Sequence, residues 1–221
     1  MNVYKLQNLR QNDVVLDLGA GIGEFSLASS RLVGPNGFVL AVEPNPEDFK
    51  TLVMNIKKNN ITNILALNYA FSDSNKTLSL SFKGTSYNAS AINCDEIIRI
   101  LRENGKETID VIKMDIEGAE VAALRNRKPI LPNIRIIAIE LHGTDSKVHT
   151  ILEPFGFIFS RFTKLQYIFS SLKFASRHPL TAMKLWKLFK KTGENPGLLK
   201  IAKGVDISIS TKLSVGIYAR N

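Results

Sequence analysis

The chain has 221 residues, of which 44% are hydrophobic and 22% are charged, and it contains one cysteine. A chain of this length and composition can bury enough apolar surface to fold without staples, which excludes the disordered and disulfide-rich classes. Because Cys94 is the only cysteine, the chain can form neither an intramolecular disulfide nor a cysteine-based metal site. The first residues contain no apolar signal segment, and no apolar run approaches the roughly 20 residues of a membrane span, so we expect a cytoplasmic protein.

The net charge of +9 comes from one end of the chain. Residues 1–150 carry 17 basic and 17 acidic side chains, whereas residues 151–221 carry 12 and 3. A neutral body with a basic extension favours an anionic partner for that extension, while a solvated basic face would leave the same pattern.

Short apolar runs alternate with amphipathic segments along the first two thirds of the chain. In chain order they predict a strand at Val14–Leu18, a helix at Glu24–Leu32, a strand at Phe38–Val42, a helix at Glu47–Asn59, a strand at Ile64–Leu67, an edge hairpin from Thr77–Phe82, a helix at Cys94–Arg102, a strand at Ile109–Met114, a helix from Glu117 to Leu124 and a strand at Ile134–Leu141. Such alternation predicts a Rossmann-like α/β fold, in which helices cover both faces of a mostly parallel sheet.

The last third continues this pattern and then departs from it. We expect a sixth strand at Phe155–Phe162 and a seventh at Leu213–Ala219. The stretch between them is too long for a hairpin connection. We therefore predict a single domain over residues 1–221, with a seven-stranded sheet and a basic, mainly helical insertion at about 164–212 before the last strand.

A glycine-rich turn, Asp17-Leu18-Gly19-Ala20-Gly21-Ile22-Gly23, follows the first predicted strand. Glycines let the backbone approach a ligand closely, and the start of the next helix offers free N–H groups. The dinucleotide fingerprint has its third glycine one residue later, where this chain has Glu24, which would repel a pyrophosphate. Asp17 is placed to bond an ammonium group, directly or through water, so the turn suits S-adenosylmethionine, which carries an amine and a sulfonium.

Acidic residues also follow the next two strands. Glu43 ends the second strand, where an acid can accept both ribose hydroxyls. After the third strand, Asp73 could accept a hydrogen bond from the adenine amine, and Phe71 could lie against the ring. The residues that we expect to bind the cofactor are Asp17, Gly19, Ala20, Gly21, Gly23, Glu43, Pro44, Asn45, Phe71, Ser72, Asp73 and Asp115.

The fourth predicted strand ends in Lys113-Met114-Asp115-Ile116-Glu117-Gly118-Ala119-Glu120. This run, together with Asp17–Gly23, Glu43–Asn45, Phe71–Asp73 and Ile139–His142, resembles the FkbM family of methyltransferases over about residues 12–142. The resemblance implies a Rossmann-like methyltransferase that methylates hydroxyls of sugars, polyketides or other secreted or surface metabolites, without naming the acceptor. The chain departs from the family in its short segment before Asp17 and in its large basic insertion.

The resemblance places the end of the fourth strand beside the methyl group to be transferred. An alcohol acceptor must lose a proton, so a general base would help. The candidates are His142, which could also be an ordinary surface residue, then Asp115 and Glu117. Asp115 could instead line the methionine end of the cofactor, and Glu140 could orient the imidazole or the acceptor.

Two other charged residues of this run receive structural interpretations. Lys113 points inward from a strand and could pair with a carboxylate, and we count it among the catalytic candidates. Glu120 is expected to cap the following helix or to pair with Arg125. No metal site is expected, because the three histidines are scattered along the chain, although Asp115 and Glu117 with an adjacent acid could hold Mg²⁺.

The basic stretch Pro179–Lys191 leaves three interpretations open. It could contact an anionic membrane surface near a lipid-linked acceptor, which would make the protein peripheral to the membrane; it could bind nucleic-acid phosphates; or it could cap the domain with Trp186 in the core. The leading hypothesis is an O-methyltransferase acting on a hydroxyl of a sugar, glycan, lipid-linked or other small-molecule acceptor. The alternatives are an RNA methyltransferase and a non-catalytic S-adenosylmethionine-binding module.

Overall fold

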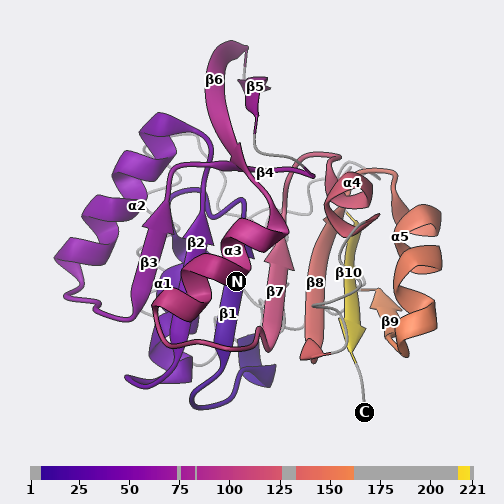
Figure 1. Ribbon diagram of the computed structural model, residues 1–221, viewed down its shortest axis with the longest axis horizontal. Coiled ribbons are helices and arrows are strands. Elements are labelled where there is room, and N and C mark those ends of the chain that lie inside the picture. The colour runs from indigo at the N-terminus through magenta and orange to yellow at the C-terminus, as the bar shows by residue number, and fades with distance from the viewer. Residues whose placement is uncertain (1–5, 74–75, 83, 126–132, 162–213, 220–221) are drawn as a thin grey trace, which may run out of the picture.

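A seven-stranded sheet forms the centre of the computed structural model, which describes residues 6–73, 76–82, 84–125, 133–161 and 214–219 (Figure 1). Its strands are β1 (Val14–Leu18), β2 (Phe38–Val42), β3 (Ile64–Leu67), β7 (Val111–Met114), β8 (Ile136–Leu141), β9 (Ile158–Arg161) and β10 (Ser214–Ala219). They lie in the order β3-β2-β1-β7-β8-β10-β9. The five strands β3, β2, β1, β7 and β8 pair in parallel, and β10 runs antiparallel to both of its neighbours, β8 and β9. The predicted seven-stranded, mostly parallel sheet is confirmed.

Helices cover both faces of this sheet. They are α1 (Glu24–Val33), α2 (Pro46–Lys58), α3 (Cys94–Glu103), α4 (Glu120–Arg125) and α5 (Asp145–Leu152), with short 3-10 helices at Leu6–Asn8 and Glu153–Phe155. On β2, Val39 and Ala41 pack with the side of α1 and α2, whereas Leu40 and Val42 belong to the core cluster under α3, α4 and α5. All four strand residues are at most 1% exposed, which explains why the strand sequences are almost continuously apolar.

A second, three-stranded sheet rises above the edge where the parallel strands end (Figure 1). It consists of β4 (Ala70–Phe71), β5 (Thr77–Phe82) and β6 (Thr85–Ile92), in the order β4-β6-β5. The predicted hairpin is therefore present, because β5 and β6 pair antiparallel. Ala70–Phe71, which was not predicted as a strand, pairs in parallel with the end of β6.

The helix predicted to begin at Glu117 begins at Glu120. Glu117 and Gly118 have φ angles of 52° and 95°, which lie in the left-handed region and cannot continue a right-handed helix. This tight turn separates the end of β7 from α4, and it places Glu117 on a loop.

Two differences lie after β8. The helix α5 was not predicted from the sequence. The strand expected from Phe155 begins at Ile158, because a 3-10 turn occupies Glu153–Phe155.

The basic insertion at about 164–212, including Pro179–Lys191, lies outside the described residues, so its helical content stays a prediction, as does the single-domain organisation. In the part of the chain that the structure describes, none of the helices has the length and apolar character needed to cross a membrane.

Candidate active site

The glycine-rich turn and the end of β7 touch through their main chains. The N–H of Asp115 donates to the carbonyl of Leu18 at 3.0 Å. Gly19 has a φ of 76°, and a Cβ atom at this position would overlap the carbonyl oxygen of Asp115. Only glycine satisfies both the backbone angle and the space, so the turn and the strand end are held in fixed contact.

Glu43 is held at the end of β2 by two backbone groups. Its Oε2 accepts from the N–H of Gly21 at 2.7 Å, and its Oε1 accepts from the N–H of Asn45 at 2.8 Å. Burial raises the pKa of Glu43, although these two hydrogen bonds oppose the rise. The carboxylate is therefore fixed in orientation, with further lone pairs on both oxygens available to hydroxyl donors.

Lys113 lies beneath the turn with a side chain that is only 5% exposed. Its Nζ donates to the carbonyl of Gly19 at 2.6 Å and lies 3.3 Å from Oδ1 of Asp17 and 3.9 Å from Oδ2 of Asp115. Asp17 is fully buried and also accepts from the hydroxyl of Ser26 at 2.5 Å. Lys113 therefore links the carbonyl of Gly19 to the carboxylates of Asp17 and Asp115.

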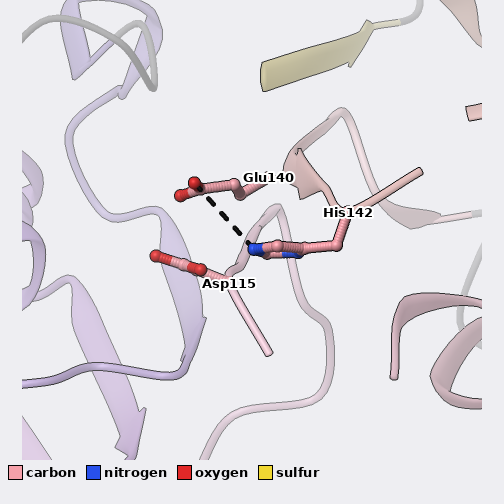
Figure 2. Close-up of side chains that lie close together, drawn as sticks. All are labelled: Asp115, Glu140 and His142. Atoms are coloured by element: carbon pink, nitrogen blue, oxygen red, sulfur yellow. Dashed lines mark ion pairs between the residues drawn. The ribbon is translucent and has the colours of Figure 1, made fainter. Parts of the chain in front are cut away.

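Three side chains from two neighbouring strand ends converge beside the turn. Figure 2 shows Asp115, Glu140 and His142 pointing toward one another, each offering one atom within 4.8 Å of the others. The Nε2 atom of His142 lies 4.0 Å from Oε1 of Glu140 and 3.4 Å from Oε2 of Glu117. We refer to Asp115, Glu140 and His142 as the acid–histidine cluster.

The other ring nitrogen of His142 faces a buried carboxylate. Nδ1 lies 2.8 Å from Oε1 of Glu120, which is 0% exposed. Burial lowers the pKa of His142, but the hydrogen bond and charge of Glu120, together with the charges of Glu117 and Glu140, outweigh it and hold the pKa above its ordinary value of 6.5. The imidazole is therefore a stronger base than a solvated histidine.

A cavity of about 370 Å³ lies between the turn, the ends of β2 and β7, and the β5–β6 hairpin. It is lined by Gly19, Gly21, Val42, Glu43, Pro44, Asn45, Asp48, Tyr69, Ala70, Phe71, Leu78, Leu80, Ser81, Tyr87, Asp115, Ile116, Glu117 and Ala119. The volume is in the range of small-molecule sites, roughly 300–1,000 Å³. These described lining residues include four carboxylates and no lysine or arginine, so the cavity suits a cationic ligand with an apolar ring and disfavours a phosphate.

The comparison with known proteins identifies the family. The model of the methyltransferase FkbM domain matches residues 17–169. The chain belongs to the FkbM family of methyltransferases. Methyltransferase sdnD of Sordaria araneosa is 27% identical over 204 residues, covering 72% of this chain and 78% of that protein. Hexuronic acid methyltransferase AglP of Haloferax volcanii is 26% identical over 170 residues, covering 72% and 69%.

A solved structure has the same fold. The crystal structure of Methyltransferase FkbM from Methylobacillus flagellatus KT superposes with a TM-score of 0.52, at 22% identity, over 68% of this chain and 40% of that one. This chain is thus a Rossmann-like methyltransferase that depends on S-adenosylmethionine.

The cavity fits that cofactor. The carboxylates suit its amine and sulfonium, and the aromatic and aliphatic walls suit an adenine ring. The predicted cofactor residues that line the cavity are Gly19, Gly21, Glu43, Pro44, Asn45, Phe71 and Asp115. Their individual contacts with the cofactor stay predictions.

The other five predicted cofactor residues are not among those that line the cavity. They are Asp17, Ala20, Gly23, Ser72 and Asp73. Asp17, which was expected to bond the ammonium group, is 0% exposed; its Oδ2 accepts from Ser26, and its Oδ1 lies 3.3 Å from Nζ of Lys113 without a hydrogen bond among the described residues. Its contact with the cofactor stays a prediction. The hydroxyl of Ser72 donates to Asp73 at 3.1 Å just after β4.

Two features of the site were missed from the sequence. The hairpin supplies Leu78, Leu80, Ser81 and Tyr87 to the cavity wall, which depends on tertiary packing. Glu120 was expected to cap a helix or to pair with Arg125, but the ion pairs of the described residues join it to His142 instead. Its spacing carried a signal, since Ala123 and Leu124 share its helical face and are buried.

The acid–histidine cluster also bears on metal binding. The sequence predicted no metal site, and this expectation stays a prediction. The three side chains lie close enough together to share a cation, although acidic groups commonly cluster without one. The two cases differ in whether a chelator abolishes activity.

Proposed function

We propose that this FkbM methyltransferase methylates a hydroxyl group of a sugar, glycan, lipid-linked or other small-molecule acceptor. The observation that carries the proposal is the position of His142, whose Nε2 belongs to the acid–histidine cluster together with Asp115, a residue that lines the cofactor cavity. A hydroxyl is a weak nucleophile until its proton is removed, and this site has a base with a raised pKa where that proton would be released.

The residues divide the work between two ends of the site. Gly21, Glu43 and Asn45 form the end that holds the cofactor, and His142 takes the hydroxyl proton on Nε2 at the other end. When bound, the cofactor would supply an electrophilic methyl group on its sulfonium, and the imidazole of His142 would keep the proton that the hydroxyl loses. Holding the acceptor in line is expected to supply most of the acceleration.

One relative supports a sugar-like acceptor. AglP is named as a hexuronic acid methyltransferase, and it matches most of this chain. A lipid-linked acceptor would fit an anionic membrane surface next to the basic insertion, which is a separate prediction about residues 164–212.

The test is transfer of a radiolabelled methyl group from S-adenosylmethionine to a panel of free sugars, uronic acids, lipid-linked glycan extract and RNA. Label in an alkali-stable ether of a sugar supports the proposal. Label in RNA would establish the alternative of an RNA methyltransferase. Tight cofactor binding without transfer to any fraction would instead establish a non-catalytic binding module.

His142→Ala tests the base. We expect turnover to fall by about 10²–10⁴-fold, because general-base help of this size is lost, with unchanged affinity for S-adenosylmethionine. The matched control is His149→Ala, an exposed histidine on α5, which should leave turnover unchanged. If a chelator abolishes activity and Mn²⁺ or Mg²⁺ restores it, the assignment of His142 as base is overturned in favour of a metal ligand.

A further inference from the structure

We propose that Glu120 is the positioning residue that turns His142 into a base with Nε2 as its proton acceptor. The catalytic consequence rests on the proposed function, whereas the effect on the imidazole itself does not.

The first observation is the burial of Glu120. It is the first residue of α4, and a carboxylate at a helix N-terminus is stabilised there while remaining in water. Glu120 instead is 0% exposed, and a buried carboxylate is strongly unfavourable unless it is hydrogen-bonded and paired. Among the described residues, the basic side chain that satisfies this need is His142.

Both oxygens of Glu120 are occupied by donors from three segments. Oε1 accepts from the N–H of Gly118 and lies against Nδ1 of His142, both at 2.8 Å. Oε2 accepts from the hydroxyl of Thr144 at 3.1 Å. A role in capping α4 would explain the bond from Gly118 alone, since His142 and Thr144 belong to the end of β8 and the start of α5.

Thr144 provides an independent sign that this arrangement is favoured. It occupies the N-cap position of α5, where a threonine hydroxyl normally accepts from a backbone N–H of its own helix. Here it makes no such bond and donates to Glu120 instead. The start of α5 thus forgoes its side-chain cap, and the second oxygen of Glu120 is satisfied.

The hydrogen bond determines which nitrogen can act. An ionised carboxylate can only accept, so the proton between the two groups belongs to Nδ1 of His142. The neutral imidazole then has its lone pair on Nε2, which faces Glu117 and Glu140 and lies within the same cluster as Asp115. Without Glu120 both tautomers would be populated and the ring could rotate, so the base would be present for only part of the time.

Two variants separate positioning from simple packing. Glu120→Gln keeps an acceptor oxygen for Nδ1 and Gly118 but removes the charge, so the titration midpoint of His142 should fall. The midpoint can be measured by ¹⁵N-histidine NMR, because the chain has only three histidines. The signal that disappears in His142→Ala is that of His142. Glu120→Ala should also populate the Nε2–H tautomer, and we expect turnover to fall roughly 100-fold, with a smaller, about tenfold fall for Glu120→Gln.

The pH profile connects the two measurements. In Glu120→Gln the acid limb of kcat should move to lower pH together with the NMR midpoint, while the KM and Kd for S-adenosylmethionine stay as in the wild type. Glu103→Gln, an exposed carboxylate on α3, is the matched control. A Glu120→Gln protein that melts earlier but keeps the wild-type midpoint and acid limb would overturn the proposal and leave Glu120 a packing residue. The NMR result stands even if no hydroxyl acceptor is found, so failure of the proposed function is separable from failure of this inference.

Discussion

The two ends of the site are built from different parts of the chain. The cofactor end depends on main-chain groups, namely the N–H groups of Gly21 and Asn45 and the bare turn at Gly19, with Glu43 held between them. The acid–histidine cluster depends on side chains, and its central hydrogen bond joins Glu120 to His142, which are 22 residues apart. The proposed binding of the donor therefore depends mainly on the backbone of the fold, whereas the proposed removal of the proton depends on a few side chains that can be altered separately.

The largest effect is expected from a substitution that disrupts the contact between Gly19 and Asp115, which connects the two ends of the site. Gly19→Ala should lower the free energy of unfolding by about 2–5 kcal/mol, because the new Cβ overlaps the carbonyl of Asp115 and the φ angle is unfavourable. Denaturant titration measures it, and cofactor binding and turnover should be lost together. Gly21→Ala is the control, since a Cβ there meets nothing within 4 Å and only the angle costs about 1–2 kcal/mol. Equal destabilisation by both substitutions would contradict the contact.

A smaller effect should be confined to the cofactor end. Glu43→Gln removes a charged acceptor, and hydrogen bonds to charged groups contribute about 1.5–3 kcal/mol, so S-adenosylmethionine should bind roughly 10–100-fold more weakly. Calorimetric titration measures the change, and turnover at saturating cofactor should remain close to wild type. Glu47→Gln, whose side chain is 83% exposed, is the matched control. Unchanged affinity in Glu43→Gln would remove this residue from the cofactor site.

The smallest effect requires no substitution and compares the two ends by pH. The pKa of His142 is raised above 6.5, so kcat should rise with pH through a midpoint above that value. A histidine whose pKa is raised in the folded state stabilises the fold most at pH values below its pKa in the unfolded chain, and this contribution is lost as the pH rises through the folded pKa. Activity should therefore rise with pH while the contribution of His142 to the free energy of unfolding falls. The pKa of Glu43 is raised from 4.5, so cofactor affinity should fall on the acid side, as Glu43 becomes protonated. A rate that is flat between pH 5.5 and 8 would contradict the role of His142.

The contrast also explains what could be predicted from the sequence. Strands β1 and β2 were predicted with their observed bounds, because apolar runs buried on both faces end at turn residues. The glycine turn and Glu43 follow from local spacing and were predicted to lie at the cofactor site, and Gly19, Gly21 and Glu43 line the cavity.

Features that depend on packing between distant segments were not predicted. The helix beginning at Glu120 was placed three residues too early, because positive φ at Glu117 has no marker in that residue type. The bond between Glu120 and His142 arises only when α4 packs beside the end of β8. Nothing in the sequence around Thr144 indicated that its hydroxyl would bond to Glu120 rather than cap α5.

The contact between Gly19 and Asp115 has a consequence for acceptor choice. Because these two strand ends meet main chain to main chain, their contact does not depend on any side chain of the hairpin or of the loop after β8. Substitutions in Leu80 or Tyr87, which line the cavity, are therefore expected to change which molecule is admitted while the contact between Gly19 and Asp115 is kept. The specificity for the acceptor can therefore be altered at the hairpin residues without changing the glycine turn or the end of β7.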